Sequence, residues 1–184
     1  MASAARDPDR VGKTDPMPSS QSQSWRAEQF DLLPASVAKQ WENFGSWPNA
    51  TYFSNVVGIE VEELRRDYAR MRLPWRAELN QPMGLMHGGA IATLIDTTVV
   101  PAIGTAYEAG RAYSTIEMSI RYVGPVRSED LVAEGWVSRR GKRVVFCDVE
   151  VRTASAVVVA SANLIYIVGS GSAAGSPPAE APPE

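Results

Sequence analysis

A single long apolar segment, residues 88–108, stands between runs of alternating apolar and polar residues and limits the folds open to this chain. The segment is too long for one strand and is rich in Ala, Leu and Ile, so it predicts a helix. Because little of its circumference is polar, we expect it to be buried along most of its length. Pro101 lacks a backbone donor and crowds the carbonyl of Thr97, which predicts a kink or a break near that point.

The alternating runs on either side have the period of half-buried antiparallel strands. Two runs precede the helix and four follow it. The predicted strands lie in GIEVEEL, YARMRLPW, STIEMSIRY, LVAEGWVSRR, KRVVFCDVEVR and SAVVVASANLIYIV. In STIEMSIRY, strict alternation places Ile116 and Met118 on one face and Thr115 and Glu117 on the other. The element order predicts an α+β fold in which an antiparallel sheet curls around a central helix.

A shorter helix is predicted before this core, because four apolar residues recur there at helical spacing. These residues are Leu33, Val37, Trp41 and Phe44. Pro34 suits the first turn of such a helix, and Gly45 suits its end. We interpret the flanking Trp25 and Trp47 as packing residues.

Composition divides the chain into one core and two tails. With 184 residues and 45% hydrophobic content, it can bury one sizeable core. Residues 1–24 and 169–184 are rich in Ser, Pro, Ala and Gly, which predicts disordered tails. Residues 25–56 are then a helical extension, and residues 57–168 are the core domain.

Charge and residue usage exclude several classes of function. A net charge of −3 gives no basic field, so we expect no nucleic-acid partner. We find no signal-peptide core and no membrane-spanning segment, and predict a cytoplasmic protein. A multi-histidine metal site is impossible with one His, and we expect no metal and no cofactor. The only cysteine, Cys147, alternates with valines and is interpreted as core packing.

Asp96 is the most informative residue, because it lies within the apolar helix. An ionised carboxylate in apolar surroundings costs several kcal/mol unless it is paired or hydrogen-bonded, so Asp96 is a candidate for chemistry. The alternative is that Asp96 caps a broken helix or faces water, with Thr97 and Thr98 marking a polar edge. Composition alone leaves both interpretations open.

The sequence His87-Gly88-Gly89 stands at the predicted start of the same helix. Two glycines let another group approach the backbone closely, and the first amides of a helix have no internal acceptor and lie at its positive end. These amides would suit a developing oxyanion. The alternative is a plain tight turn before a helix.

The spacing of these two groups predicts an obligate dimer. Eight residues separate Gly88 from Asp96, a rise of about 12 Å, so one chain cannot bring both groups to one carbonyl. Two copies with antiparallel helices could place the acid of each near the amide of the other, giving two composite sites at a twofold interface.

The run NQPMGLMHGGAIATLIDTTVV, followed by STIEMSIRYVGPV and RRGKRVVFCDVEV, resembles the hotdog-fold thioesterases, specifically the phenylacetyl-CoA thioesterase-like (PaaI-like) branch. The resemblance covers residues 57–168, the whole predicted core. Its specific elements are HGG, an acid nine positions after the His, and an amide side chain six positions before it. It implies the hotdog fold and an acyl-CoA thioesterase that forms homodimers or dimers of dimers.

The resemblance also implies roles for residues near the helix start. Gln81 corresponds to the side chain that places the thioester or the attacking water, although the neighbouring Asn80 leaves the register uncertain by one. Gly88 corresponds to the amide donor to the thioester carbonyl, supported by Gly89. His87 has a structural role and ties down the turn.

The remaining implied roles belong to the helix and the next strand. Asp96 corresponds to the nucleophile or general base, and the sequence does not separate these two routes. Thr115 corresponds to the hydroxyl that orients the water, with Ser114 as the fallback. The implied reaction is hydrolysis of an acyl-CoA thioester, in which Gly88 polarises the carbonyl and Asp96 of the partner chain activates water or attacks directly.

Basic residues in the core are candidates for contacts with the phosphates of CoA. They are Arg139, Arg140, Lys142 and Arg143 in the turn RRGKR, and Arg121 on the predicted strand STIEMSIRY. We favour the alternative that the turn residues are solvated hairpin charges.

Two rival functions remain within the same fold. A non-catalytic acyl-CoA sensor would keep the pocket and lose the acid, but Asp96 is retained. An acyl-thioester dehydratase or hydratase would use a catalytic His paired with an acid on a different motif. The preferred acyl group cannot be inferred from the sequence, because the pocket walls come from several strands and both chains.

Overall fold

The computed structural model describes residues 26–41, 44, 51–107 and 111–169. The predicted tails fall outside these residues except for Gly169, and so do Trp25, Gly45 and Trp47.

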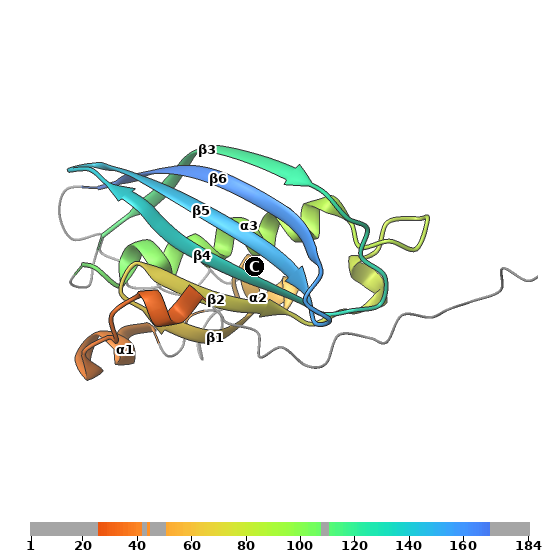
Figure 1. Cartoon of the computed structure of the whole chain (residues 1–184), viewed down its shortest axis with the longest axis horizontal. Helices are drawn as coiled ribbons and strands as arrows, with labels where there is room; N and C mark the ends of the chain where they lie inside the picture. The colour runs from red at the N-terminus through yellow and green to blue at the C-terminus, as the bar shows by residue number, and fades with distance from the viewer. Residues whose placement is uncertain (1–25, 42–43, 45–50, 108–110, 170–184) are drawn as a thin grey trace, which may run out of the picture.

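Six antiparallel strands form one sheet in the order β1-β2-β4-β5-β6-β3 (Figure 1). The strands are β1 (Glu60–Arg65), β2 (Tyr68–Leu73), β3 (Tyr113–Tyr122), β4 (Leu131–Arg140), β5 (Val144–Thr153) and β6 (Val158–Val168). All six predicted strands are present. β3, the first strand after the long helix, crosses to the far edge of the sheet and pairs there with the last strand, β6.

The helix α3 (Gly88–Gly104) lies across one face of this sheet, behind it in Figure 1. Leu94, Ile95 and Val99 of α3 are completely buried, so the prediction of a buried central helix is confirmed. α3 continues through Pro101 to Gly104, so the predicted break is wrong, whereas the predicted kink stays a prediction. Pro101 lies in the last turn and is itself buried, so one missing backbone bond is offset by packing against the sheet.

The core between helix and sheet follows the predicted alternation of β5. Val145, Cys147, Val149 and Val151 are all buried. Burial raises the pKa of Cys147 to about 12, which keeps the thiol protonated and inert at neutral pH. The interpretation of Cys147 as core packing is therefore confirmed.

The N-terminal extension contributes the short helices η1 (Arg26–Gln29), α1 (Ala35–Trp41) and α2 (Phe53–Val57). The helix predicted around Leu33 and Trp41 is thus present as α1, with a shorter span. A Cβ on Gly104 would lie 1.9 Å from the ring of Trp41, so only glycine at the end of α3 allows this close approach.

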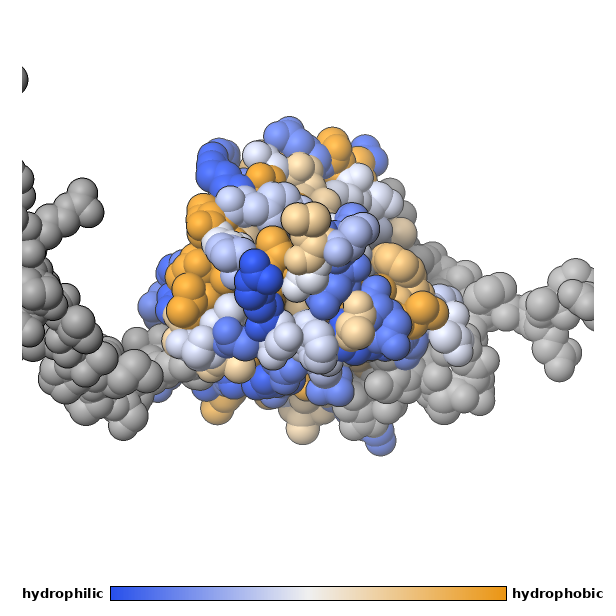
Figure 2. Space-filling view, turned by 90° about the vertical axis from the view of Figure 1, so that its right-hand side faces the viewer, coloured by the Kyte–Doolittle hydropathy of each residue, from blue (hydrophilic) through white to orange (hydrophobic). Residues whose placement is uncertain are grey.

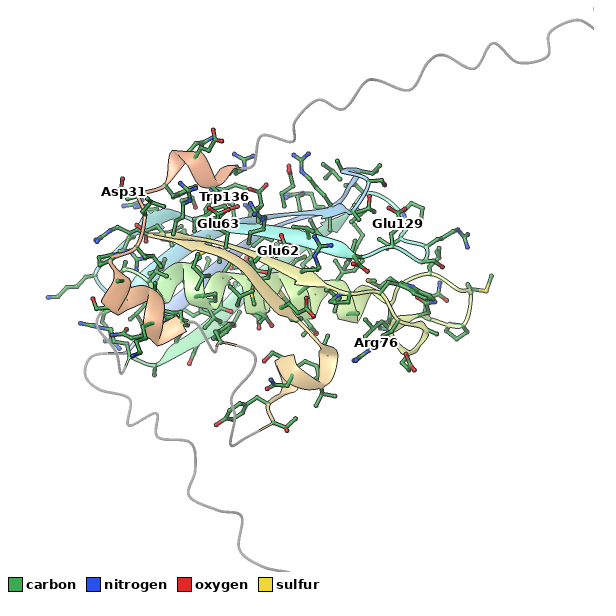
Figure 3. The ribbon with its side chains drawn as sticks, turned by 90° about the horizontal axis from the view of Figure 1, so that it is seen from below. Asp31, Glu62, Glu63, Arg76, Glu129 and Trp136 are labelled. Atoms are coloured by element: carbon green, nitrogen blue, oxygen red, sulfur yellow. The ribbon has the colours of Figure 1, made fainter. Side chains whose placement is uncertain are left out.

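η1 is anchored to the sheet by polar contacts. The backbone N–H of Arg26 donates to the buried carboxylate of Glu134 at 2.7 Å. The guanidinium of Arg26 lies 4.2 Å from the ring centroid of Trp136, which Figure 3 shows beside this turn. These contacts hold the extension against β4.

The two edges of the sheet differ in chemistry. β1 presents Glu62 and Glu63, labelled in Figure 3, and Glu62 forms ion pairs with Arg70 and Arg72 of β2. β3 instead exposes large apolar side chains. Ile116, Met118 and Tyr122 are 57%, 37% and 50% exposed, and Val123, which follows, is 62% exposed. Charged edges discourage strand pairing, whereas an exposed apolar edge is a surface that another chain could cover.

Candidate active site

Asp96 lies in the middle of α3, on the side that faces the β3–β6 end of the sheet. Its carboxylate oxygen Oδ1 accepts a hydrogen bond from the Thr115 hydroxyl at 2.9 Å and another from the Tyr166 hydroxyl at 2.5 Å. Because α3 continues beyond it, Asp96 caps no broken helix. The half-buried carboxylate is instead stabilised by two hydroxyl donors.

A β-bulge in β3 explains how Thr115 reaches the helix. Thr115 pairs with Tyr166 of β6, whereas Glu117 pairs with Ile165 and Met118 pairs with Leu164, so Ile116 is the extra residue. Paired residues on neighbouring strands point to the same side of a sheet. Thr115 therefore shares the helix-facing side with Met118, and the strict alternation expected from the sequence is wrong across the bulge.

Ser114, the fallback for Thr115, pairs with Ile167. It is one position removed from Thr115 and so points to the opposite side of β3. Thr115 is thus the hydroxyl residue that the structure brings to Asp96.

Tyr166 is a site residue that sequence reasoning missed. Its ring is 2% exposed, and its hydroxyl lies 3.1 Å from the backbone oxygen of Asp96 as well as against Oδ1. Burial and the hydrogen bond to Asp96 raise the pKa of Tyr166 above its ordinary value of 10.0. The only signal in the sequence was the alternation of β6, which indicates a core position and says nothing about the hydroxyl.

The start of α3 is built by His87 and the second glycine. His87 is the N-cap residue, and its ring nitrogen Nδ1 accepts from the Gly89 N–H at 2.8 Å. This geometry assigns a neutral imidazole with its proton on Nε2. A Cβ on Gly89 would lie 2.9 Å from Nδ1, so a side chain there would push the capping ring away.

Gly88, the first residue of α3, has a different environment. Its carbonyl accepts from the Tyr122 hydroxyl at 3.0 Å, which ties the helix start to the end of β3. Among the described residues the Gly88 N–H forms no hydrogen bond. An unpaired amide at the positive end of a helix of 17 residues is a suitable donor to an oxyanion.

Asn80 and Gln81 lie in the loop before α3 but take different positions. The Asn80 side chain accepts from the Trp75 indole N–H at 3.3 Å, and Asn80 lines a groove beside the helix start. The Gln81 side chain accepts from the Met83 N–H within its own turn and does not line that groove. Of the two amides, Asn80 is the one that lies beside the glycines.

The groove has a volume of about 480 Å³. His87 and Gly89, on either side of Gly88, form one wall, and Phe53 and Val57 of α2 form another. Figure 2 views the end of the molecule where the loop before α3 lies, and hydrophobic and hydrophilic residues are interspersed over it. A second cavity of about 430 Å³, lined by residues of α1 and by Thr105, contains none of the predicted site residues.

The predicted phosphate-binding residues fall into two groups. Arg140 is half-buried, and its Nη2 forms an ion pair with Asp67 and donates to the Ile103 carbonyl. Its Nε and Nη1 are buried and have no hydrogen-bond partner among the described residues. The others are exposed, and Arg121 donates to Asn163 at 3.3 Å. Arg139, near the end of β4, and Lys142 and Arg143, in the β4–β5 turn, are all exposed.

The part of the chain described by the structure contains no cluster of three or more His, Cys, Asp or Glu side chains that could ligate a metal. In the same residues no helix has both the length and the apolar composition needed to cross a bilayer.

Comparison with known proteins identifies the family. A model of the thioesterase superfamily matches residues 83–160, which contain the whole of α3 and most of the sheet that follows it. A Halobacterium salinarum protein named as an esterase is 33% identical over 102 residues, which are 53% of this chain and 67% of that protein. This chain belongs to the thioesterase superfamily. The medium/long-chain acyl-CoA thioesterase YigI of Escherichia coli is 26% identical to it over 64% of this chain and 85% of YigI.

Solved structures show which fold this thioesterase-superfamily chain has. A conserved protein from Pseudomonas aeruginosa, 28% identical, matches 65% of this chain and 95% of its own with a TM-score of 0.62. The PaaI protein of the E. coli phenylacetic acid degradation operon matches 74% of this chain and 97% of its own with a TM-score of 0.66. At 20% identity, the match to PaaI shows the fold alone. The predicted α+β hotdog fold and the resemblance to the hotdog-fold thioesterases are confirmed.

Proposed function

We propose that this chain hydrolyses the thioester of an acyl- or aryl-CoA to the free acid and CoA. The observation that supports this most directly is the state of Asp96. Its carboxylate lies on α3 and accepts hydrogen bonds from the hydroxyls of Thr115 on β3 and Tyr166 on β6. The first amide of the same helix, at Gly88, forms no hydrogen bond among the described residues. A carboxylate and an unpaired helix-start amide are the two groups that thioester hydrolysis needs.

The proposed reaction begins when the Gly88 N–H donates a hydrogen bond to the thioester carbonyl oxygen. Asp96 then removes a proton from a water that attacks the carbonyl carbon, or attacks that carbon itself to form an anhydride that water opens. Negative charge develops on the carbonyl oxygen and is stabilised by the amide and the helix dipole. The carbon–sulfur bond breaks, and the thiolate of CoA leaves and takes up a proton.

Acyl-CoA is the proposed substrate class because relatives such as YigI are named for it. The groove supports this choice, since apolar side chains of α2 lie opposite the polar helix start and could contact an acyl or aryl group. In this arrangement Asn80 orients the thioester or the water. The exposed Arg139, Lys142 and Arg143 are the residues most open to the CoA phosphates, although solvated charge remains our favoured interpretation of that turn.

We further propose a homodimer with composite sites. Asp96 and Gly88 are eight residues apart on one continuous helix, a rise of about 12 Å, so they need a second chain to meet at one carbonyl. The exposed apolar side chains of the β3 edge offer a surface for that chain.

The first test measures release of free thiol from a panel of acyl-CoAs by the wild type and Asp96→Asn. The substitution keeps the size of the side chain and removes its charge, so we expect kcat to fall by at least about a hundredfold while the protein stays folded. Turnover by Asp96→Asn at the wild-type rate would refute the role of Asp96. Binding of acyl-CoA by the wild type without turnover would instead indicate a sensor.

The second test asks whether each site uses two chains. Gly88→Pro removes the amide hydrogen and adds a ring, at a position where proline is well accepted because it is the first of a helix and follows the extended backbone of His87. Gly88→Ala is the matched control and keeps the amide. We expect both Gly88→Pro and Asp96→Asn to be inactive alone, and their refolded mixture to recover up to about a quarter of wild-type activity. No recovery in a mixture that forms heterodimers would contradict composite sites.

A further inference from the structure

Tyr166 is a buried residue with a polar hydroxyl, and the reaction proposed above assigns it no role. It lies in β6 with its ring in the core between the sheet and α3, and its hydroxyl points at Asp96. A core tyrosine normally needs a hydrogen-bond partner for its hydroxyl, and here that partner is the proposed catalytic carboxylate.

The contacts of Tyr166 fix the orientation of the Asp96 side chain. The hydroxyl lies 2.5 Å from Oδ1 and 3.1 Å from the backbone oxygen of Asp96, so it bridges the side chain and the main chain of one residue. Rotation of the carboxylate about its side-chain bonds would break the shorter contact. Because the Tyr166 ring is packed in the core, the hydroxyl cannot follow such a rotation.

Thr115 approaches the same oxygen from the neighbouring strand. The β3–β6 register places Thr115 directly opposite Tyr166, so the two hydroxyls act as a pair of donors to Oδ1. Among the described residues, Oδ2 accepts no hydrogen bond. The two hydroxyls therefore hold one carboxylate oxygen, Oδ1, and leave Oδ2 available to contact water or substrate.

Burial keeps this donor protonated. Burial, together with the hydrogen bond to Asp96, raises the pKa of Tyr166 above its ordinary value of 10.0. Tyr166 consequently remains a phenol, and a donor, at neutral pH.

We propose that Tyr166 is a positioning residue which, with Thr115, holds Oδ1 of Asp96 so that Oδ2 is the oxygen that activates water or attacks the thioester. This inference rests on the proposed function. Misplacing a reacting group by about 1 Å can cost on the order of a hundredfold in rate, so a loosened carboxylate should react slowly even though substrate still binds.

The test is steady-state kinetics of Tyr166→Phe, which removes the phenolic oxygen and keeps the ring. We expect kcat to fall by about ten- to a hundredfold with KM within about twofold of wild type. Thr115→Val, on the exposed strand, should show the same pattern and provides a second variant should Tyr166→Phe not fold. A change in KM alone would show that Tyr166 contacts substrate and would overturn the proposal.

Tyr68→Phe is the matched control. Tyr68 is also a fully buried tyrosine whose hydroxyl donates to a carboxylate, Glu134, at 2.7 Å. Removing its hydroxyl should lower thermal stability as Tyr166→Phe does and leave kcat near the wild-type value. Equal losses of kcat in both variants, or an unchanged kcat in Tyr166→Phe or Thr115→Val, would overturn the positioning role. Full activity of Asp96→Asn would instead mean that the proposed function itself had failed.

Discussion

His87 caps the N-terminus of α3 with a ring nitrogen. Nδ1 accepts from the Gly89 N–H, which leaves Nε2 as the protonated nitrogen. A dehydratase would need this histidine as its acid or base, but the ring is engaged as a cap. The structure therefore favours the supporting role that the resemblance implied for it.

We expect His87→Ala to lower the free energy of unfolding by about 1 kcal/mol, because the Gly89 N–H loses its acceptor. His87→Asn, which keeps a capping acceptor, should recover most of this loss. Urea denaturation followed by circular dichroism would measure both variants. A loss of more than a thousandfold in kcat for a folded His87→Asn would contradict a purely structural role.

Residues differ in how far their roles could be predicted. Asp96 was found because a carboxylate in an apolar helix needs a partner, and Gly88 was found because it begins that helix. Tyr166 could not be found, because the sequence of β6 does not specify which of its inward side chains faces Asp96 of α3. Which side chain does so depends on how the helix crosses the sheet.

At the scale of elements, β3 determines most of the candidate site. Its bulge places Thr115 on the helix-facing side, and its last residue, Tyr122, binds the carbonyl of Gly88. Its outer edge has no neighbouring strand within the described sheet. One strand thus connects the carboxylate, the helix start and the expected dimer surface.

We expect charges on this edge to dissociate the dimer. Ile116→Glu combined with Val123→Glu places two acids on exposed apolar positions, and like charges would face each other across a twofold interface. Light scattering after gel filtration should report a monomer, and kcat should fall more than tenfold.

Val157→Glu is the control for added charge. Val157 is 57% exposed, like Ile116, but lies in the turn between β5 and β6. This variant should stay dimeric and active. A fully active monomer of the β3 double variant would show that each chain has a complete site.

At the scale of the whole molecule, the buried thiol couples folding to pH. Burial raises the pKa of Cys147 from 9.0 to about 12. Below about pH 9 the thiol is protonated in both the folded and unfolded states, so stability does not depend on it. Between about pH 9 and 12 the unfolded chain loses the proton and the folded chain keeps it, so this contribution to stability falls as pH rises.

Cys147→Ala removes that dependence. The variant should be less stable at neutral pH because it leaves a cavity, but its deficit should shrink by about 1.4 kcal/mol between about pH 8 and pH 10. Urea titrations of both proteins across this range would measure the difference. A constant deficit would mean that the thiol ionises equally in the folded and unfolded states.

The sequence by itself determined the elements of this protein. Period, length and turn residues identify six strands and a buried helix, because these properties depend on neighbours along the chain. The resemblance to hotdog thioesterases then supplied their arrangement and the roles of Gly88 and Asp96.

Only the tertiary structure decided which side chains meet. The bulge at Ile116, the choice of Asn80 over Gln81 beside the groove, and the pairing of Tyr166 with Asp96 all depend on how segments distant in sequence pack. A bulge shifts the facing of a strand by one residue with no required change in composition. Alternation along one strand therefore cannot specify such contacts, whereas the packing of α3 against β3 and β6 does.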